Sequence, residues 1–139
     1  METRKLEQVP PIRQIDNGNQ KIPRPSIANR RKKNVSKRNR IIRAIGSRVK
    51  QLVPEGSQAV LFGSRARGDA REDSDWDVLV LLDKERIALS DYDEVTYPMR
   101  ELGWDLGETI NTVLYTKADW QNEKSSPFYE NVTKEGIIL

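Results

Sequence analysis

Residues 61–82 read LFGSRARGDAREDSDWDVLVLL, and this stretch decides which kind of domain the chain forms. Its ends are apolar and its middle is polar. The pattern predicts one strand over Gln58–Phe62, which stops at a glycine, and a second strand over Trp76–Leu82 that runs into the core. A tight polar connection joins the two strands. Asp75 and Asp77 therefore stand at the mouth of the buried strand, where a binding site is expected.

The first strand ends on a Gly-Ser pair. A glycine lets the backbone approach a bulky anion, and the amides and hydroxyl that follow can donate to phosphate oxygens. Gly63 and Ser64 are therefore candidates for holding the triphosphate of a nucleotide. Arg65 and Arg67 lie just beyond, where one of them can add a charge-assisted contact, although both are equally consistent with surface residues. A Gly-Ser turn by itself is more often structural.

The second strand opens with Asp75 and Asp77, which are two positions apart. The period of two aims both carboxylates at one face of the sheet, while Trp76 points to the other face. Paired carboxylates repel unless a cation neutralises them, and Mg²⁺ favours carboxylate oxygens together with substrate phosphates. Two ions roughly 3.5 to 4 Å apart are used in phosphoryl transfer, and Mn²⁺ is an alternative ion. An Asp-x-Asp pair alone is often merely solvated, but its combination with Gly-Ser favours a metal and nucleotide site.

Composition limits the chemistry that this site can use. The chain has 139 residues and contains neither cysteine nor histidine, so a thiolate nucleophile, a zinc site built from Cys or His and a histidine base are all excluded. Any metal has oxygen ligands. The longest apolar runs are too short to span a bilayer and the first residues lack a signal peptide's apolar segment, so we expect a cytoplasmic protein without a membrane partner.

Outside the central stretch, helical and strand patterns alternate. Apolar spacing predicts a first helix that begins with Ser36 as its N-cap and stops at Pro54. A second helix, from residue 90 to about residue 105, contains Pro98, which should kink or divide it. The remaining expected elements are a strand over Thr109–Tyr115, a helical turn over Lys117–Asn122, a helix opened by Ser126 and Pro127, and a closing strand over Gly136–Leu139. This order predicts an α/β fold (α+β class) with a small sheet covered by helices.

The overall charge of +3 hides a basic first part and an acidic remainder. Residues 1–50 carry 15 basic and 3 acidic side chains, and residues 51–139 carry 9 basic and 18 acidic ones. Residues 1–35 are polar and rich in proline, which predicts a flexible basic arm, and residues 36–139 form the domain. The arm can contact nucleic-acid phosphates or dock onto an acidic partner, and without aromatic residues it supports backbone attraction only.

The spacing of the central motif resembles a known signature. Gly63-Ser64, ten residues and Asp75-x-Asp77 resemble the Gly-Ser-x10-Asp-x-Asp motif of the minimal nucleotidyltransferase family, in the DNA polymerase β-like superfamily. The resemblance covers about residue 40 to the C-terminus, since residues 126–136 (SPFYENVTKEG) are similar to the ending of small bacterial members. It implies a mixed sheet flanked by helices.

The resemblance also implies an activity. Members transfer a nucleoside monophosphate from a nucleoside triphosphate to a hydroxyl with magnesium, so AMP transfer from ATP to a protein or nucleic acid is the leading expectation. Asp75 and Asp77 would hold the metal as catalytic residues, and Gly63 and Ser64 would hold the β- and γ-phosphates. Minimal members often act as antitoxins that modify a ribonuclease toxin of the HEPN type. Such a toxin would be a separate protein, because its Arg-His motif needs a histidine that this chain lacks.

One position departs from the family pattern. The third carboxylate of the metal site normally lies on the next strand, where the matching residue here is Asn111. An amide cannot accept a proton at neutral pH, so catalysis is weak, uses another base or is lost while binding survives. Glu108, just upstream, could replace that carboxylate if the strand entered differently, but it is expected to be an exposed acid at the strand end. A degenerate domain that acts as an antitoxin or adaptor by binding its partner is therefore the alternative to an enzyme.

Overall fold

A four-stranded sheet carries the predicted site residues, and the computed structural model describes it within residues 27–139. β1 (Gln58–Phe62) pairs antiparallel with β2 (Trp76–Leu82), and β2 pairs parallel with β3 (Ile110–Thr116). β4 (Ile137–Ile138) lies antiparallel along the other side of β1, which gives the order β3-β2-β1-β4. The sheet is mixed, as the resemblance implied, and the Asp-x-Asp motif lies at the start of the inner strand β2.

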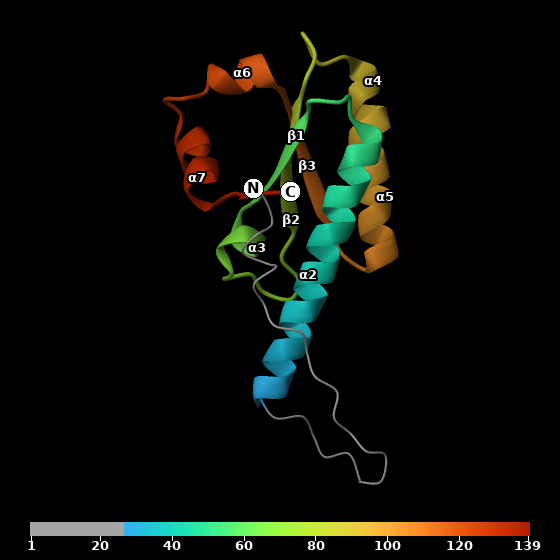
Figure 1. Cartoon of the computed structure of the whole chain (residues 1–139), viewed down its shortest axis with the longest axis vertical. Helices are drawn as coiled ribbons and strands as arrows, with labels where there is room; N and C mark the ends of the chain where they lie inside the picture. The colour runs from blue at the N-terminus through green and yellow to red at the C-terminus, as the bar shows by residue number, and fades with distance from the viewer. Residues whose placement is uncertain (1–26) are drawn as a thin grey trace.

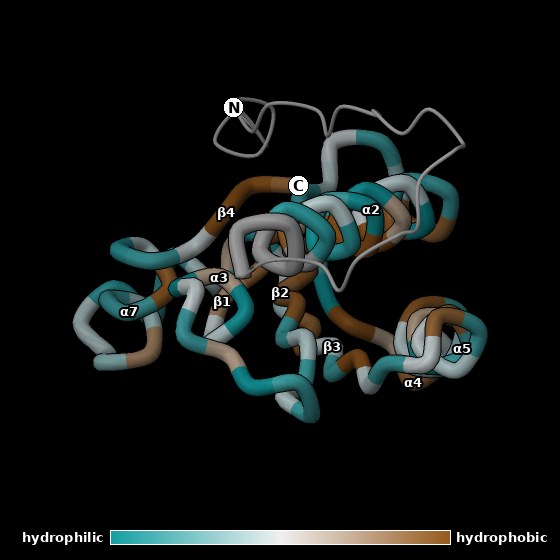
Figure 2. Tube along the Cα trace, turned by 90° about the horizontal axis from the view of Figure 1, so that it is seen from below, coloured by the Kyte–Doolittle hydropathy of each residue, from teal (hydrophilic) through white to brown (hydrophobic). Residues whose placement is uncertain are grey.

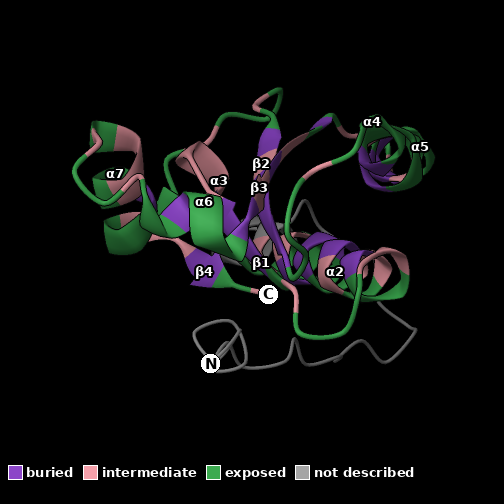
Figure 3. Ribbon diagram, turned by 90° about the horizontal axis from the view of Figure 1, so that it is seen from above, coloured by how far each residue is buried: buried purple, intermediate pink, exposed green. Residues whose placement is uncertain are grey.

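Helices cover both faces of this sheet (Figures 1 and 3). One face is covered by α2 (Ile27–Leu52), by the short α4 (Leu89–Asp91), by the π-helical segment η1 (Tyr92–Thr96) and by α5 (Tyr97–Leu106). The other face is covered by α6 (Lys117–Gln121) and α7 (Pro127–Glu135). A single turn, α3 (Ser64–Arg67), follows β1. This α/β arrangement agrees with the fold class predicted from the sequence.

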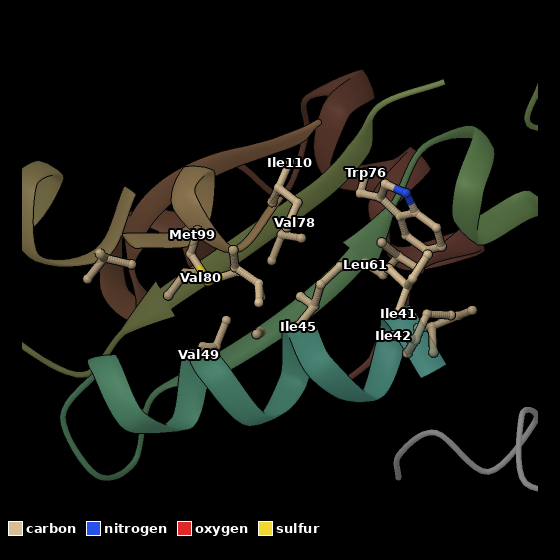
Figure 4. Packing of buried hydrophobic residues seen from close by; sticks show 14 of the residues in the cluster. Ile41, Ile42, Ile45, Val49, Leu61, Trp76, Val78, Val80, Met99 and Ile110 are labelled. Carbon is tan, nitrogen blue, oxygen red and sulfur yellow. The ribbon is translucent and has the colours of Figure 1, made fainter. Parts of the chain in front are cut away.

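The main core lies between α2, α5 and the sheet. Every second residue of β2, namely Trp76, Val78, Val80 and Leu82, points into it. From α2 come Ile41, Ile42, Ile45 and Val49, whose spacing forms one apolar stripe (Figure 4). Figure 2 shows the same separation, with hydrophobic segments turned toward the sheet and hydrophilic ones outward. Burial of each such side chain contributes roughly 1.5 to 3 kcal/mol. The strand that carries the two aspartates is therefore firmly anchored.

The first helix begins earlier than the sequence predicted. α2 starts at Ile27, so Ser36 lies within the helix rather than capping it, and residues 27–35 belong to this helix instead of the predicted arm. The apolar pattern located only the part of the helix that packs on the sheet. The preceding residues 27–35 (IANRRKKNV) include Ala, Arg and Lys, which have high helix propensity, but they contain no apolar period to reveal the helix. The rest of the predicted arm, residues 1–26, lies outside the described residues.

One local prediction is wrong and one is confirmed. Pro98 does not divide the second helical region, because α4, η1 and α5 follow one another without a gap and Thr96 and Tyr97 both have helical backbone angles; the π-helical segment η1 instead precedes Pro98 in the first turn of α5. The hydroxyl of Ser126 accepts a hydrogen bond from the Tyr129 amide at 3.1 Å, so Ser126 caps α7 as expected. Within the described residues, none of the helices has both the length and the apolar character needed to cross a membrane.

Candidate functional site

The strand register brings the predicted residues together at one end of the sheet. Phe62 at the end of β1 pairs with Asp77 on β2, and Asp77 pairs with Asn111 on β3. Gly63 follows Phe62, so it lies beside Asp77. Three strands thus place a glycine, an aspartate and an asparagine next to one another. Trp76 points into the core on the opposite face, as the alternation predicted.

Gly63 is required at its position for two independent reasons. Its φ is 79°, a left-handed conformation that side chains other than glycine rarely adopt. A Cβ built on Gly63 would also lie 2.4 Å from Oδ2 of Asp77. The glycine therefore keeps open the space directly beside the Asp77 carboxylate, and this is the space that a substrate must enter to reach it.

The two aspartates share a hydrogen-bond donor. Nδ2 of Asn111 donates to Oδ2 of Asp75 at 2.8 Å and to Oδ1 of Asp77 at 3.3 Å. Asp75 is exposed, whereas Asp77 is partly buried. That burial, and after it the charge of Asp75, raise the pKa of Asp77 above its usual range, although the Asn111 hydrogen bond and the charge of Arg67 act in the opposite direction. The site concentrates negative charge that the protein only partly compensates.

Glu135, the last residue of α7, contacts the loop after β1. The backbone amide of Gly63 donates to Oε2 of Glu135 at 3.0 Å, although the two residues are 72 positions apart. Nη1 of Arg67 lies 3.3 Å from both carboxylate oxygens of Glu135, and Nε of Arg67 donates to Asp69 at 3.2 Å. Sequence reasoning missed Glu135, because a single glutamate near a helix end has no local pattern that marks it as functional.

Arg67 and Arg65 leave α3 in different directions. Arg67 is exposed and lies near enough to Asp77 for its charge to lower the pKa of that carboxyl group. The Arg65 guanidinium instead donates to the carbonyls of Ser74 and Glu72, at 2.9 and 3.1 Å, and stacks 4.6 Å from the Trp76 ring centre. These contacts hold the loop that leads to Asp75, whereas the predicted nucleotide contact of Arg65 stays a prediction.

Glu108 differs from the exposed acid that the sequence predicted. Its side chain is only 9% exposed, and Oε1 accepts a hydrogen bond from the Trp76 indole at 2.9 Å. Arg65 lies 3.5 Å and Lys37 3.6 Å from its oxygens. Trp76 faces away from the aspartates, so Glu108 lies on the wrong side of β2 to replace the third carboxylate. Within the described residues, no group of three acids could hold a metal ion together.

Comparisons with known proteins show the family to which this chain belongs. The model of the nucleotidyltransferase domain family matches residues 42–136. A protein of Methanocaldococcus jannaschii named "Putative protein adenylyltransferase MJ0604" is 34% identical over 80 residues, which cover 58% of this chain and 74% of the relative. The match to the family model begins within α2 and ends just after α7, so it includes every residue of the candidate site.

Two solved structures are also similar to this chain. One is a chain from a crystal structure of a toxin-antitoxin with AMP-PNP, with a TM-score of 0.46, 17% identity and coverage of 71% of this chain and 69% of that chain. The other is described as a putative nucleotidyltransferase from Sulfolobus solfataricus, with a TM-score of 0.49, 20% identity and coverage of 75% and 83%. By its match to the family model and to the M. jannaschii relative, this chain belongs to the nucleotidyltransferase domain family of the polymerase β-like superfamily.

Proposed function

We propose that this chain is a magnesium-dependent nucleotidyltransferase that moves AMP from ATP to a hydroxyl group of a protein and releases pyrophosphate. The observation that carries the proposal is the placement of Asp75 and Asp77 on one face of β2, with Gly63 pressed against Asp77. The name of the M. jannaschii relative, a protein adenylyltransferase, supports AMP as the transferred group and a protein as the acceptor.

The loop after β1 supports binding of the triphosphate. In α3 the amides of Ala66 and Arg67 donate to the Gly63 carbonyl, both at 3.0 Å. The Gly63 amide donates to the Glu135 carboxylate. Helix geometry leaves the amides of Ser64 and Arg65 without an acceptor inside the turn, so these two amides and the Ser64 hydroxyl are the donors that we assign to the β- and γ-phosphates. Arg67 adds a positive charge beside them.

The two aspartates fit a magnesium ion that is shared with the nucleotide. They lie close enough for one amide to donate to both, and Mg²⁺ is commonly held by one or two carboxylates together with substrate phosphates. When bound, the ion neutralises negative charge that develops on the transferred phosphoryl group. Asp75 and Asp77 supply ligands for one ion, and a second ion, as expected from the sequence, would share them and depend on phosphate oxygens.

Asn111 limits the rate of the proposed transfer. The acceptor hydroxyl must lose a proton as it attacks the α-phosphate, and an amide cannot take it. A positioned base contributes typically 10²- to 10⁴-fold, so we expect transfer to be slow compared with a site that has a carboxylate at this position. The chain's own residues still bind and orient the nucleotide, and without a protein base the hydroxyl proton passes to solvent water as pyrophosphate leaves.

The acceptor that we propose is a toxin of the HEPN type, which modification with AMP would neutralise. This part of the proposal rests on the resemblance of residues 126–136 to small bacterial members. A second candidate function is partner binding without transfer. The hydrogen bonds from Asn111 to both aspartates favour it, because they let the two carboxylates stay close without a metal ion.

The first experiment measures thermal unfolding with ATP and magnesium, in the native protein and in Asp77→Asn. Binding at a hundredfold above the dissociation constant should stabilise the protein by roughly 2.7 kcal/mol. The proposal expects a magnesium-dependent shift that the variant loses. If neither protein shows a shift in unfolding temperature, the nucleotide site is rejected and partner binding remains as the candidate function.

Transfer itself is tested with labelled ATP and the co-expressed partner. Label at the α-phosphate should become attached to the partner, and label at the γ-phosphate should leave with pyrophosphate. Asp77→Asn should abolish labelling and, if transfer is the function, also abolish neutralisation of the partner. Neutralisation that survives in this variant would instead favour the binding function.

A further inference from the structure

A cavity of about 380 Å³ lies behind β2, on the side away from the aspartates. Trp76 contributes to its wall, and this side chain faces α2, whereas Asp75 and Asp77 face the opposite side of the strand. The basic side chains that line the cavity are Lys37, Arg38, Arg65 and Arg71. Its volume lies in the range of small-ligand sites. Strand β2 lies between this cavity and the proposed transfer site.

Two of these arginines have capacity to bind an anion. The described residues offer the Arg38 side chain one hydrogen-bond partner, the carbonyl of Arg65 at 2.8 Å, which occupies one of its five N–H groups. Burial, and then the nearby charge of Arg65, lower the pKa of Arg38 below its usual value. Arg71 is exposed, and no described carboxylate lies within ion-pair distance of either Arg38 or Arg71.

Two acidic residues also line the cavity, but they do not neutralise all of its positive charge. Glu108 is already shared among the Trp76 indole, Arg65 and Lys37. Glu72 is exposed on the loop. Its backbone carbonyl, rather than its carboxylate, accepts a hydrogen bond from the Arg65 guanidinium. Four cations therefore meet two acids, and the two cations without an acidic partner among the described residues come from different elements, Arg38 from α2 and Arg71 from the loop after α3.

The positive charge continues outward along α2. This helix of 26 residues contains no acidic residue, and it is about 39 Å long at 1.5 Å per residue. Figure 1 shows that its first turns extend past the end of the sheet. Lys32, Lys33, Lys37 and Arg40 are exposed on this part of the helix. The cavity thus lies beside a row of cations rather than forming an isolated charged spot.

We propose that the cavity binds a phosphate group of a nucleic-acid backbone and that the cations of α2 contact neighbouring phosphates. Guanidinium groups match phosphate geometry through paired N–H bonds, and two of them without an acidic partner line this cavity. A long row of one charge sign suits a linear chain of phosphates. The contact is with the backbone alone, because no described residue of the row offers an aromatic ring for base stacking.

Fluorescence anisotropy with a labelled single-stranded oligonucleotide tests this proposal over a series of salt concentrations. Replacing both arginines, Arg38→Gln with Arg71→Gln, should remove the phosphate contact of the cavity and flatten the slope of log affinity against log salt by about 0.7. Arg71→Gln alone should flatten it by less, and since this side chain has no bond to the described protein, folding should be unaffected. Arg100→Gln, which removes the same charge from exposed α5, should leave the slope unchanged.

Three outcomes would overturn the proposal. The double variant could bind with the affinity and slope of the native protein. Polyglutamate could displace the oligonucleotide as well as an unlabelled oligonucleotide of equal charge does, which would assign the surface to an acidic protein. AMP or inorganic phosphate could bind in the cavity while the oligonucleotide does not. Asp77→Asn should bind the oligonucleotide normally, so this result is independent of the transfer reaction.

Discussion

The side-chain amide of Asn111 lies 2.8 Å from Oδ2 of Asp75, on the neighbouring strand of the sheet. The same nitrogen lies 3.3 Å from Asp77, so one amide partly compensates two carboxylates. A carboxylate at position 111 would instead add a third negative charge at the same point. At the metal site that we propose, Asn111 therefore exchanges metal affinity for stability without metal.

Asn111→Asp should reverse this exchange. In metal-free buffer the variant should unfold at a lower temperature, because three carboxylates repel one another. Magnesium alone should then stabilise it more than it stabilises the native protein, and transfer should become faster by up to 10²- to 10⁴-fold if the new carboxylate acts as a base. Asn111→Ala is the control, since it loses the hydrogen bonds without adding charge. A variant that gains nothing from magnesium would contradict the assigned metal site.

Asp77→Asn should make the folded protein more stable at neutral pH. Partial burial and then the charge of Asp75 raise the pKa of Asp77 in the folded state above the ordinary value of 3.8. The free energy of unfolding therefore falls as pH rises through the interval between the unfolded and folded pKa values. Asparagine does not titrate, so the variant should lack this decrease in the free energy of unfolding. Urea unfolding in metal-free buffer should give the variant a higher free energy of unfolding than the native protein at pH values above this interval. At pH values below the interval the two proteins should be nearly equal in stability.

Asp73→Asn on the exposed loop controls for the loss of one negative charge in that experiment. If both variants show the same pH dependence, the effect reflects net charge rather than the environment of Asp77.

Glu135→Gln should separate the two contacts of Glu135. Glutamine retains an oxygen that can accept from the Gly63 amide, but it loses the ionic attraction to exposed Arg67, which contributes at most about 1 kcal/mol. Glu135→Ala leaves a partly buried amide without its acceptor and should cost about 1 to 3 kcal/mol. We expect the KM for ATP to rise slightly in the first variant and strongly in the second, with kcat changed less. Equal KM values in all three proteins would exclude a role in positioning the loop.

Gly63→Ala and Gly68→Ala form a matched pair. Both glycines have positive φ, 79° and 92°, so both substitutions impose backbone strain of roughly 1 to 3 kcal/mol, although Gly68 is αL whereas Gly63, with ψ −162°, lies in a region that is nearly restricted to glycine. A Cβ at Gly68 meets nothing within 4 Å, whereas one at Gly63 collides with Oδ2 of Asp77. Thermal unfolding should show a larger loss for Gly63→Ala, and only this variant should lose the shift with ATP and magnesium. Equal losses would mean that closeness to Asp77 has no consequence.

Glu108→Gln should retain nucleotide transfer. Its carboxylate serves Trp76, Arg65 and Lys37, and glutamine keeps an acceptor for the indole while losing the charge. We expect a modest loss of thermal stability and a transfer rate within a few-fold of native, measured with α-labelled ATP. A loss as complete as that of Asp77→Asn would show that Glu108 does act as the missing base.

The central part of the fold could be predicted because its signals are local. Strand alternation fixes the relative directions of Asp75, Trp76 and Asp77 within three residues, and the structure places Trp76 in the core as expected. A glycine that ends a strand is likewise visible in the sequence. The start of α2 was missed because its first turns are not packed on the sheet and so carry no apolar period.

Contacts between distant positions could not be predicted in the same way. Arg65 and Arg67 are equivalent in sequence, yet one reaches Trp76 and the other Glu135. Their directions depend on how the turn of α3 is oriented on the sheet. Glu108 was expected to be exposed because it precedes a strand, but the indole of Trp76 gives it a partly buried acceptor position that no spacing rule specifies.

The bond between Gly63 and Glu135 has a consequence for the order in which the protein matures. A ribosome makes both aspartates before it reaches residue 135, so the growing chain carries the carboxylates of the proposed site while the adjoining loop still lacks its contact with Glu135. Contacts between distant positions slow folding, because the intervening chain must be closed into a loop first. A copy whose synthesis stops before residue 135 should therefore keep the complete sequence motif and lose the ATP binding that we propose.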